Sequence, residues 1–175
     1  MSSKQILGDI GIQQALDNLA EQIAKSNPPS EQTILVGIIT RGATLANRLK
    51  KILSKKYNLQ LVTASLDTRP FRDDLQEEIK ENRSEMPEAI DGKNIIIVDD
   101  VVSTGRTIRA ALDALMDCGR PKNIKTAILI DLDHRELPIT SNYIGIKLHT
   151  SVREKIKVRL KEVDKGKDRA YITLK

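Results

Sequence analysis

Two adjacent carboxylates, Asp99 and Asp100, follow a run of β-branched residues at 95–98, and the short turn Ser103-Thr104-Gly105-Arg106-Thr107 comes directly afterwards. The apolar run predicts a strand that is buried on both faces, as in a parallel sheet, and that ends at the carboxylates. Apolar residues at helical spacing follow the turn. A strand, a turn with hydroxyls and glycine, and a helix start together aim backbone N–H groups at one point, which attracts phosphate.

A purely structural alternative makes the carboxylates polar residues at a strand end and makes Ser103 the N-cap of the next helix. That alternative leaves two like charges side by side, which is unfavourable unless a cation or hydroxyl donors compensate them. The pair suits a ligand that carries a phosphate and a diol, or a phosphate with Mg²⁺. The chain lacks the G-x-x-x-x-G-K-[ST] loop of P-loop ATPases and the G-x-G-x-x-G loop of dinucleotide-binding folds.

The elements around this stretch indicate an α/β fold. Helical spacing predicts helices over residues 12–23 (ended by Asn27-Pro28-Pro29-Ser30) and 45–53, and apolar runs predict strands over 34–39, 59–66, 126–131 and 143–148. Residues 156–160 and 170–174 alternate between apolar and polar types, which predicts an antiparallel hairpin with one solvated face. We therefore expect one domain over residues 1–175, with a parallel sheet flanked by helices and an added C-terminal hairpin.

Composition limits the classes of partner. The 175 residues are 39% hydrophobic and 30% charged, as in ordinary soluble domains, and the four aromatic residues do not favour a stacking surface for nucleic acid. No apolar run approaches the roughly 18 residues that span a bilayer, and the first residues do not resemble a signal peptide. A single cysteine, Cys118, agrees with a reducing compartment. We expect a cytoplasmic protein without a membrane partner, whose net charge of +5 favours anionic ligands.

Two charged segments have both a functional and an ordinary interpretation. Residues 67–92 form a long polar stretch, which is typical of a mobile lid or of a solvated or disordered loop. A basic stripe runs through Lys157, Arg159 and Lys161 and continues at Lys165, Lys167 and Arg169. The stripe fits an RNA contact, but the solvated face of an edge hairpin is the simpler interpretation.

The stretch at 95–107 resembles the phosphoribosyl-pyrophosphate (PRPP) motif of type I phosphoribosyltransferases. Further motifs narrow the resemblance to pyrimidine-operon attenuation regulators of the PyrR type, which double as uracil phosphoribosyltransferases. These motifs are Leu35-Val36-Gly37-Ile38 leading to Thr40-Arg41-Gly42, Phe71-Arg72-Asp73-Asp74-Leu75, Gly119-Arg120-Pro121 and His134-Arg135-Glu136-Leu137-Pro138. The resemblance covers nearly the whole chain, and it implies a type I phosphoribosyltransferase fold with a small hood over the site, assigned to residues 131–150.

The resemblance also implies roles for individual residues. Asp99 and Asp100 would bind the ribose hydroxyls, Thr40-Arg41-Gly42 would form the pyrophosphate loop, and Arg72, from a lid at 67–92, would close on pyrophosphate. The implied PRPP- or nucleotide-binding residues are Thr40, Arg41, Gly42, Asp99, Asp100, Val101, Val102, Ser103, Thr104, Gly105, Arg106 and Thr107. The implied catalytic residues are Asp99, Asp100, Arg41 and Arg72. Mg²⁺ would be held mainly by oxygens of PRPP and pyrophosphate, without a dedicated protein metal site.

The regulator side of the resemblance implies binding of pyrimidine-operon leader RNA, controlled by UMP or UTP. The residues carried over for RNA contact are Thr40, His134 and Arg135. The chain departs from the family's pattern at Leu132 and Asp133 beside the base site, and at the RNA-facing positions Asp17, Glu21, Thr140 and Ile146. Gained acids and lost bases oppose binding to phosphates.

Together these features predict a bifunctional protein that forms UMP and pyrophosphate from uracil and PRPP and that attenuates transcription by binding RNA. The alternative is a diverged paralogue that binds PRPP or nucleotide but has lost RNA binding or efficient catalysis. The family also implies a homo-oligomer, a dimer or larger.

Overall fold

The main layer of the molecule is a five-stranded parallel sheet. In this computed structural model, which describes residues 3–25, 32–74 and 81–174, the strand order is β3-β2-β4-β5-β6. The strands are β2 (Thr33–Ile38), β3 (Val62–Leu66), β4 (Asn94–Val102), β5 (Asn123–Asp131) and β6 (Tyr143–Lys147). Every neighbouring pair is parallel, so the carboxyl ends of all five strands lie at one edge.

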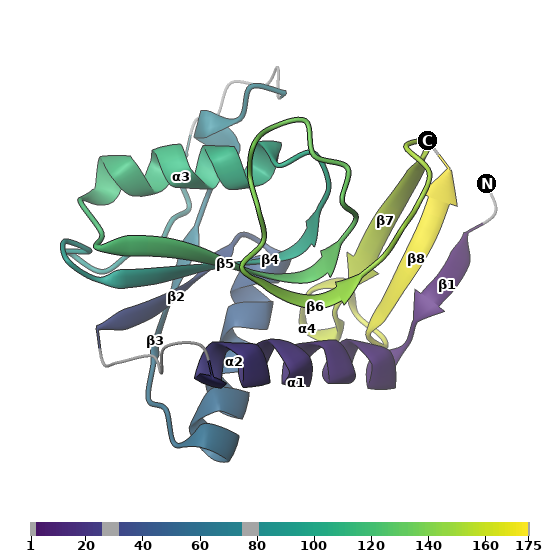
Figure 1. The fold of residues 1–175 in the computed structure, drawn as a ribbon, viewed down its shortest axis with the longest axis horizontal. Helices are drawn as coiled ribbons and strands as arrows, with labels where there is room; N and C mark the ends of the chain where they lie inside the picture. The colour runs from purple at the N-terminus through teal and green to yellow at the C-terminus, as the bar shows by residue number, and fades with distance from the viewer. Residues whose placement is uncertain (1–2, 26–31, 75–80, 175) are drawn as a thin grey trace.

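Helices cover both faces of this sheet, as Figure 1 shows: α1 (Asp9–Lys25) and α2 (Arg41–Tyr57) lie on one face, and α3 (Arg106–Cys118) lies on the other. The central strand β4 contributes side chains to both cores. Ile96 and Val98 pack with α1 and α2, whereas Ile95 and Ile97 pack with α3. This alternation explains the unbroken apolar run, because a strand between two helical layers has no solvated side.

A second, smaller sheet stands beside the carboxyl edge of the first (Figure 1). Its order is β1-β8-β7, all antiparallel, with β1 at Lys4–Leu7, β7 at Glu154–Arg159 and β8 at Arg169–Leu174; the short helix α4 (Lys161–Asp164) lies between β7 and β8. The predicted α/β fold and C-terminal hairpin are confirmed. The sequence did not predict β1, which has only four residues and shows no clear alternation.

The expectation that the central strand ends at the carboxylates was wrong. β4 runs on to Val102, and its ladder with β5 continues through Val101 opposite Ile130 and Val102 opposite Asp131. Because β5 extends as far, the backbone groups beyond the carboxylates keep their partners. Asp99 and Asp100 are therefore held inside a paired strand.

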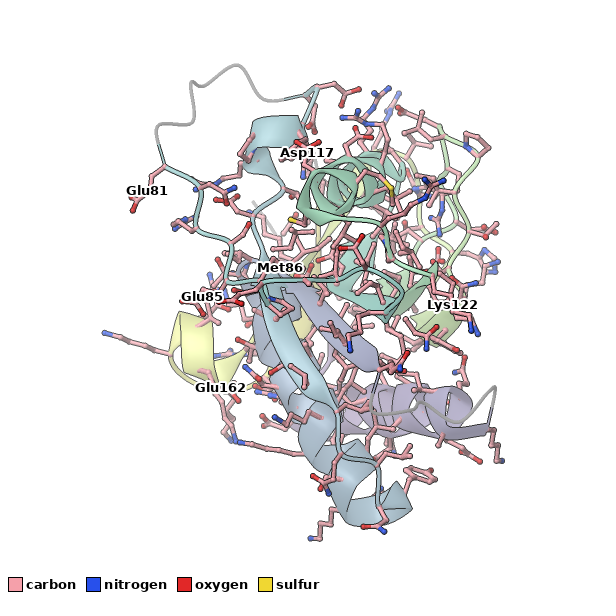
Figure 2. All side chains as sticks on the ribbon, turned by 90° about the vertical axis from the view of Figure 1, so that its left-hand side faces the viewer. Glu81, Glu85, Met86, Asp117, Lys122 and Glu162 are labelled. Carbon is pink, nitrogen blue, oxygen red and sulfur yellow. The ribbon has the colours of Figure 1, made fainter. Side chains whose placement is uncertain are left out.

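The described parts of the 67–92 segment are anchored to the domain. Asp67 is 2% exposed and is bound by Arg69 and by the backbone of Arg83, while the segment returns along β3 through a bridge between Ser65 and Glu85 (Figure 2). Ile90 is fully buried. Residues 75–80, and the predicted helix end at 27–30, lie outside the described residues, so a lid at 67–92 stays a prediction.

Within the 131–150 segment, residues 143–147 form β6, the edge strand of the main sheet, and the assignment of the segment as a hood stays a prediction. Among the helices that the structure describes, none combines the length and the apolar character needed to cross a membrane.

Candidate functional site

The site begins with the two carboxylates near the end of β4. Burial raises the pKa of Asp99 well above its usual range, and the neighbouring Asp100 raises it further. Burial also raises the pKa of Asp100, although the positive charge of Arg41 opposes that effect. Each carboxylate accepts one backbone hydrogen bond: the Asp100 N–H donates to Asp99 Oδ1 and the Val101 N–H donates to Asp100 Oδ1, both at 2.9 Å. The pair is thus poised to accept hydrogen bonds from a ligand's hydroxyl groups.

The turn after β4 leaves the start of α3 without a side-chain cap. The N-cap residue is Gly105, with φ of 92°, and not Ser103 as the structural alternative required. Glycine adopts this left-handed backbone conformation with little steric cost, which explains why a glycine stands at position 105. The Arg106 N–H donates only a long hydrogen bond, at 3.4 Å, to Thr104 Oγ1, and the N-cap residue supplies no side chain, so an anion has access to the positive end of the helix.

The loop after β5 fixes this turn from the other side. The Arg135 guanidinium donates through Nη1 to the Ser103 carbonyl at 2.9 Å and through Nη2 to Asp131 Oδ2 at 2.6 Å. The Glu136 and Leu137 N–H groups donate to the Thr104 carbonyl at 3.0 and 3.3 Å. In this structure the Arg135 guanidinium supports the phosphate turn, and its RNA contact stays a prediction.

Arg41 lies at the first residue of α2, directly after a cis peptide bond between Ile39 and Thr40. Its guanidinium pairs with Asp164 of α4, with Nε at 3.1 Å from Oδ2 and Nη2 at 2.5 Å from Oδ1. Gly42 allows this arrangement, since a Cβ there would lie 2.3 Å from the Val98 carbonyl oxygen. The start of α2 therefore sits directly against β4, next to Asp100.

Arg72 approaches the same region from the 67–92 segment. It donates through Nη1 to Thr107 Oγ1 at 2.8 Å and through Nε to Asp74 Oδ1 at 2.7 Å, and its charge opposes in part the rise in the pKa of Asp99 that burial causes. Arg106 likewise pairs with Asp73, at 2.7 Å, and with Glu136. The predicted residues Arg41, Arg72, Asp99, Asp100 and the turn are thus brought together, with one cation acting on each carboxylate.

Two adjoining cavities open between this region and β7. The larger, about 580 Å³, is lined by Val101, Leu132 and Ile156 together with Ser103 and Thr104 of the phosphate turn. The smaller, about 400 Å³, shares Val101 and Ile156 and is lined by Arg41, Asp100 and Asp164. One cavity therefore joins the phosphate turn to apolar walls that suit a planar base, and the other contains the charged groups that suit pyrophosphate.

The carboxylates of the site could hold Mg²⁺ only together with oxygen atoms of a bound ligand. Within the described ranges, no three His, Cys, Asp or Glu residues gather to hold a metal. A Mg²⁺ ion commonly takes one or two carboxylates and completes its shell with phosphate oxygens and water. Asp99 and Asp100 fit that limited contribution.

Three of the four predicted RNA-side departures gather at another place, and the fourth, Thr140, does not lie among them. Asp17, Glu21 and Ile146 line a groove of about 450 Å³ between α1, α2 and β6. Both acids are paired with lysines, Asp17 with Lys56 at 2.7 Å and Glu21 with Lys25. Thr40 lies at the start of α2, and the His134 ring Nε2 contacts the Thr150 carbonyl at 2.7 Å, so neither residue lines this groove.

Sequence reasoning missed two contributors to the site. Asp164 pairs with Arg41 from the segment between β7 and β8, and Ile156 forms an apolar wall of the larger cavity together with Leu132, which the sequence placed beside the base site. No local signal marks them, because they come into contact with the site only when the small sheet packs beside the large one. Asp133, next to Leu132, has φ of 60° and pairs with Lys147 at 2.9 Å.

Comparisons with known proteins agree with this geometry. The phosphoribosyl transferase domain family matches residues 2–162. Bifunctional protein PyrR of Streptococcus equi subsp. zooepidemicus is 44% identical over 172 residues, which is 98% of each chain, and that of Streptococcus sanguinis is 41% identical over the same shares.

Solved structures share the fold at low identity. A hypoxanthine-guanine phosphoribosyltransferase from Bacillus anthracis superposes with a TM-score of 0.73 at 19% identity, covering 99% of this chain and all of that one. A hypoxanthine phosphoribosyltransferase from Staphylococcus aureus gives 0.72 at 20% identity, covering 98% and 92%. The full-length match to the PyrR proteins and the paired carboxylates beside an uncapped helix start lead to one conclusion: the chain belongs to the PyrR family, bifunctional proteins built on a phosphoribosyltransferase domain.

Proposed function

We propose that the site transfers the phosphoribosyl group of PRPP to uracil, forming UMP and pyrophosphate. The observation that carries the proposal is the position of Asp99 and Asp100 between the uncapped start of α3 and the Arg41 side chain. The 5-phosphate would bind the turn at 103–107, and the ribose hydroxyls would bind the two carboxylates. Pyrophosphate would lie in the smaller cavity beside Arg41.

In this reaction N1 of uracil bonds to C1 of the ribose while the bond from C1 to pyrophosphate breaks, and the departing pyrophosphate takes up the N1 proton of uracil. Positive charge develops on the ribose and negative charge on the leaving group, so no protein nucleophile is needed. The protein supplies orientation and electrostatic stabilisation. Arg41 would neutralise the leaving group, and Asp99 and Asp100 would face the developing positive charge. Mg²⁺, bound through PRPP, would supply further charge neutralisation on the phosphates.

The test is UMP formation from uracil, PRPP and Mg²⁺ by the full chain. Asp100→Asn should lower kcat/KM at least 100-fold, because the substituted side chain no longer opposes the ribose charge. Asp117→Asn is the matched control, since Asp117 is an exposed residue on α3 (Figure 2). Equal activity in all three proteins, or none in the unsubstituted chain at any Mg²⁺ concentration, would refute the proposal.

We further propose that the chain binds pyrimidine-operon leader RNA and that UMP or UTP in the same pocket controls this binding. The supporting observation is the set of hydrogen bonds from Arg135, Glu136 and Leu137 to the phosphate turn, because a nucleotide phosphate in that turn would act on the loop that also carries His134. Filter binding to a leader hairpin, with and without UMP, tests it. No binding at low salt would favour the diverged paralogue, to which the groove at Asp17, Glu21 and Ile146 points.

A further inference from the structure

The outer face of the three-stranded sheet carries a dense row of cations. Strand alternation and the register of β7 with β8 place Lys155, Lys157, Arg159, Arg169 and Tyr171 on one face, since Lys157 lies opposite Tyr171 and Arg159 opposite Arg169. The intervening residues Val158 and Ala170 are buried against α1 and the main sheet. The five residues, which we call the outer patch, therefore point away from the core.

In the segment from β7 to β8, the acidic side chains and the cations of the outer patch have different partners. Its carboxylates are engaged by the domain: Asp164 pairs with Arg41, and Glu162 and Asp168 pair with Arg48. Across the part of the chain that the structure describes, no carboxylate lies within salt-bridge distance of any cation of the outer patch. Three more lysines, Lys161, Lys165 and Lys167, are exposed in the connection to β8. The outer patch is thus a one-sign surface.

The centre of the patch is a tyrosine ring held by two arginines. The guanidinium carbons of Arg159 and Arg169 lie 6.0 and 5.8 Å from the centroid of the Tyr171 ring, within cation–π range. Arg169 Nε is also buried without a hydrogen-bond partner among the described residues. The ring therefore lies beside two guanidinium groups that form no salt bridge with the described residues.

We propose that the outer patch binds single-stranded RNA on the face of β7 and β8 that points away from the core, although Lys155, Lys157 and Arg159 also border the two cavities. Lys155, Lys157 and Arg159 recur every second residue, so their Cα atoms span about 13 Å along β7. A row of this spacing matches successive phosphates of an extended strand, while Tyr171 with its arginines offers flat groups on which a base stacks. A small anion would use only one of these positions, which is why a polyanion is the better fit.

The test measures binding of a fluorescent 12-residue oligouridylate to the full chain by anisotropy, over a range of salt concentrations. Replacing Lys155, Lys157 and Arg159 by Gln should weaken binding at least tenfold at low salt. It should also reduce the slope of log K against log salt by about 2, because each single-strand phosphate contact contributes roughly 0.7. Tyr171→Leu should weaken binding, whereas Tyr171→Phe should keep most of it.

The matched control replaces three exposed lysines elsewhere, Lys51, Lys55 and Lys122, by Gln. Lys122 lies on the opposite side of the molecule from α4 in Figure 2. The control should bind within twofold of the unsubstituted chain, and circular dichroism should give both triple variants similar melting temperatures. Equal losses in both triples would show an effect of net charge alone and overturn the proposal.

Two further outcomes would overturn it. Stoichiometric displacement of the oligonucleotide by pyrophosphate would assign Lys157 and Arg159, which also border the smaller cavity, to the leaving group. Binding to phosphatidylserine vesicles without binding to the oligonucleotide would identify a membrane surface instead. Because neither uracil nor PRPP is present, failure here is separate from failure of UMP formation or of hairpin binding.

Discussion

At the scale of single residues, the site matches two buried carboxylates with two cations that approach from different elements. Arg41 comes from the start of α2 and Arg72 from the 67–92 segment. Both guanidinium groups are already paired, Arg41 with Asp164 and Arg72 with Asp74. Ligand phosphates must therefore compete with protein carboxylates for the same cations, which makes those carboxylates determinants of affinity.

Asp164→Asn tests this competition. Without the carboxylate, Arg41 is free to meet pyrophosphate, so the inhibition constant for pyrophosphate should fall by up to about fivefold, as expected from losing a partly exposed ion pair worth up to about 1 kcal/mol. Product inhibition of UMP formation measures this. Glu162→Gln is the control, since Glu162 lies on the same helix but pairs with Arg48. Weaker inhibition in Asp164→Asn would contradict the competition.

Asp99→Asn should make the protein more stable while it loses activity. The pKa of Asp99 is raised in the folded state, so the folded protein holds the ionised form at a cost above that pKa, and the cost disappears as pH falls below the ordinary carboxyl range. At pH 7.5 the variant should melt higher, by about 2–4 °C for each kcal/mol relieved. The difference should shrink toward pH 4 in thermal melts. A constant difference across this range would count against the buried charge as its cause.

At the scale of elements, the site depends on how closely α2 meets β4. Gly42→Ala would place a methyl group 2.3 Å from the Val98 carbonyl, so the start of α2 must move and Arg41 with it. We expect a loss of kcat/KM of at least tenfold and a lower melting temperature. Gly8→Ala is the matched control, because the added Cβ would meet only the end of the Gln5 side chain at 3.4 Å. Near-normal kinetics in Gly42→Ala would show that this approach is not required.

The elements themselves could be predicted well where burial gives a strong pattern. The run at 95–98 predicted a strand buried on both faces, and the alternation at 156–160 and 170–174 predicted the hairpin; both are confirmed. β1 was missed because a four-residue strand gains its stability from pairing with β8, which no local pattern shows. The N-cap at Gly105 was missed because Ser103 has the better capping propensity, but β4 runs to Val102 and α3 begins only at Arg106, three residues after Ser103.

Some residues of the site could likewise be predicted from the sequence, and others could not. Those close together in sequence, Asp99, Asp100 and the turn, could be recognised from type and spacing. Asp164 and Ile156 could not, since they reach the site only through the packing of the small sheet. The role of Arg135 also escaped prediction, because its hydrogen bonds to Ser103 and Asp131 depend on the path of the loop.

At the scale of the whole molecule, Arg48 joins the main layer to the small sheet. From α2 it pairs with Glu162 of α4 and with Asp168 before β8, and both Arg48 and Asp168 are largely buried. Asp168 also accepts the Lys161 N–H at 2.9 Å, and its own N–H donates to Asp9. These bonds set the position of the small sheet over the cavities.

Arg48→Leu should therefore reduce the free energy of unfolding by about 3 kcal/mol, because Asp168 is left charged and largely buried without its partner. Arg48 lowers the pKa of Asp168, so the pair contributes above the ordinary carboxyl range and its contribution is lost as pH falls below it. Urea titrations at pH 7 and pH 3 should show a large difference from the unsubstituted chain at pH 7 and a smaller one at pH 3. An equal difference at both pH values would exclude the ion pair as the cause.

The pairing of β1 with β8 has a consequence for the order in which the molecule assembles. Lys4 lies opposite Ile172, so this ladder joins segments from opposite ends of the described chain, whereas β2, β3, β4 and β5 pair with strands nearer in sequence. Closing so long a loop is slow and costs entropy before contacts reward it. We expect the five-stranded parallel sheet to form first and the three-stranded sheet, which borders the cavities, to form last. In native-state hydrogen exchange, β1 and β8 should open at lower free energy than β4, so the protein could admit ligands by local unfolding of one small sheet.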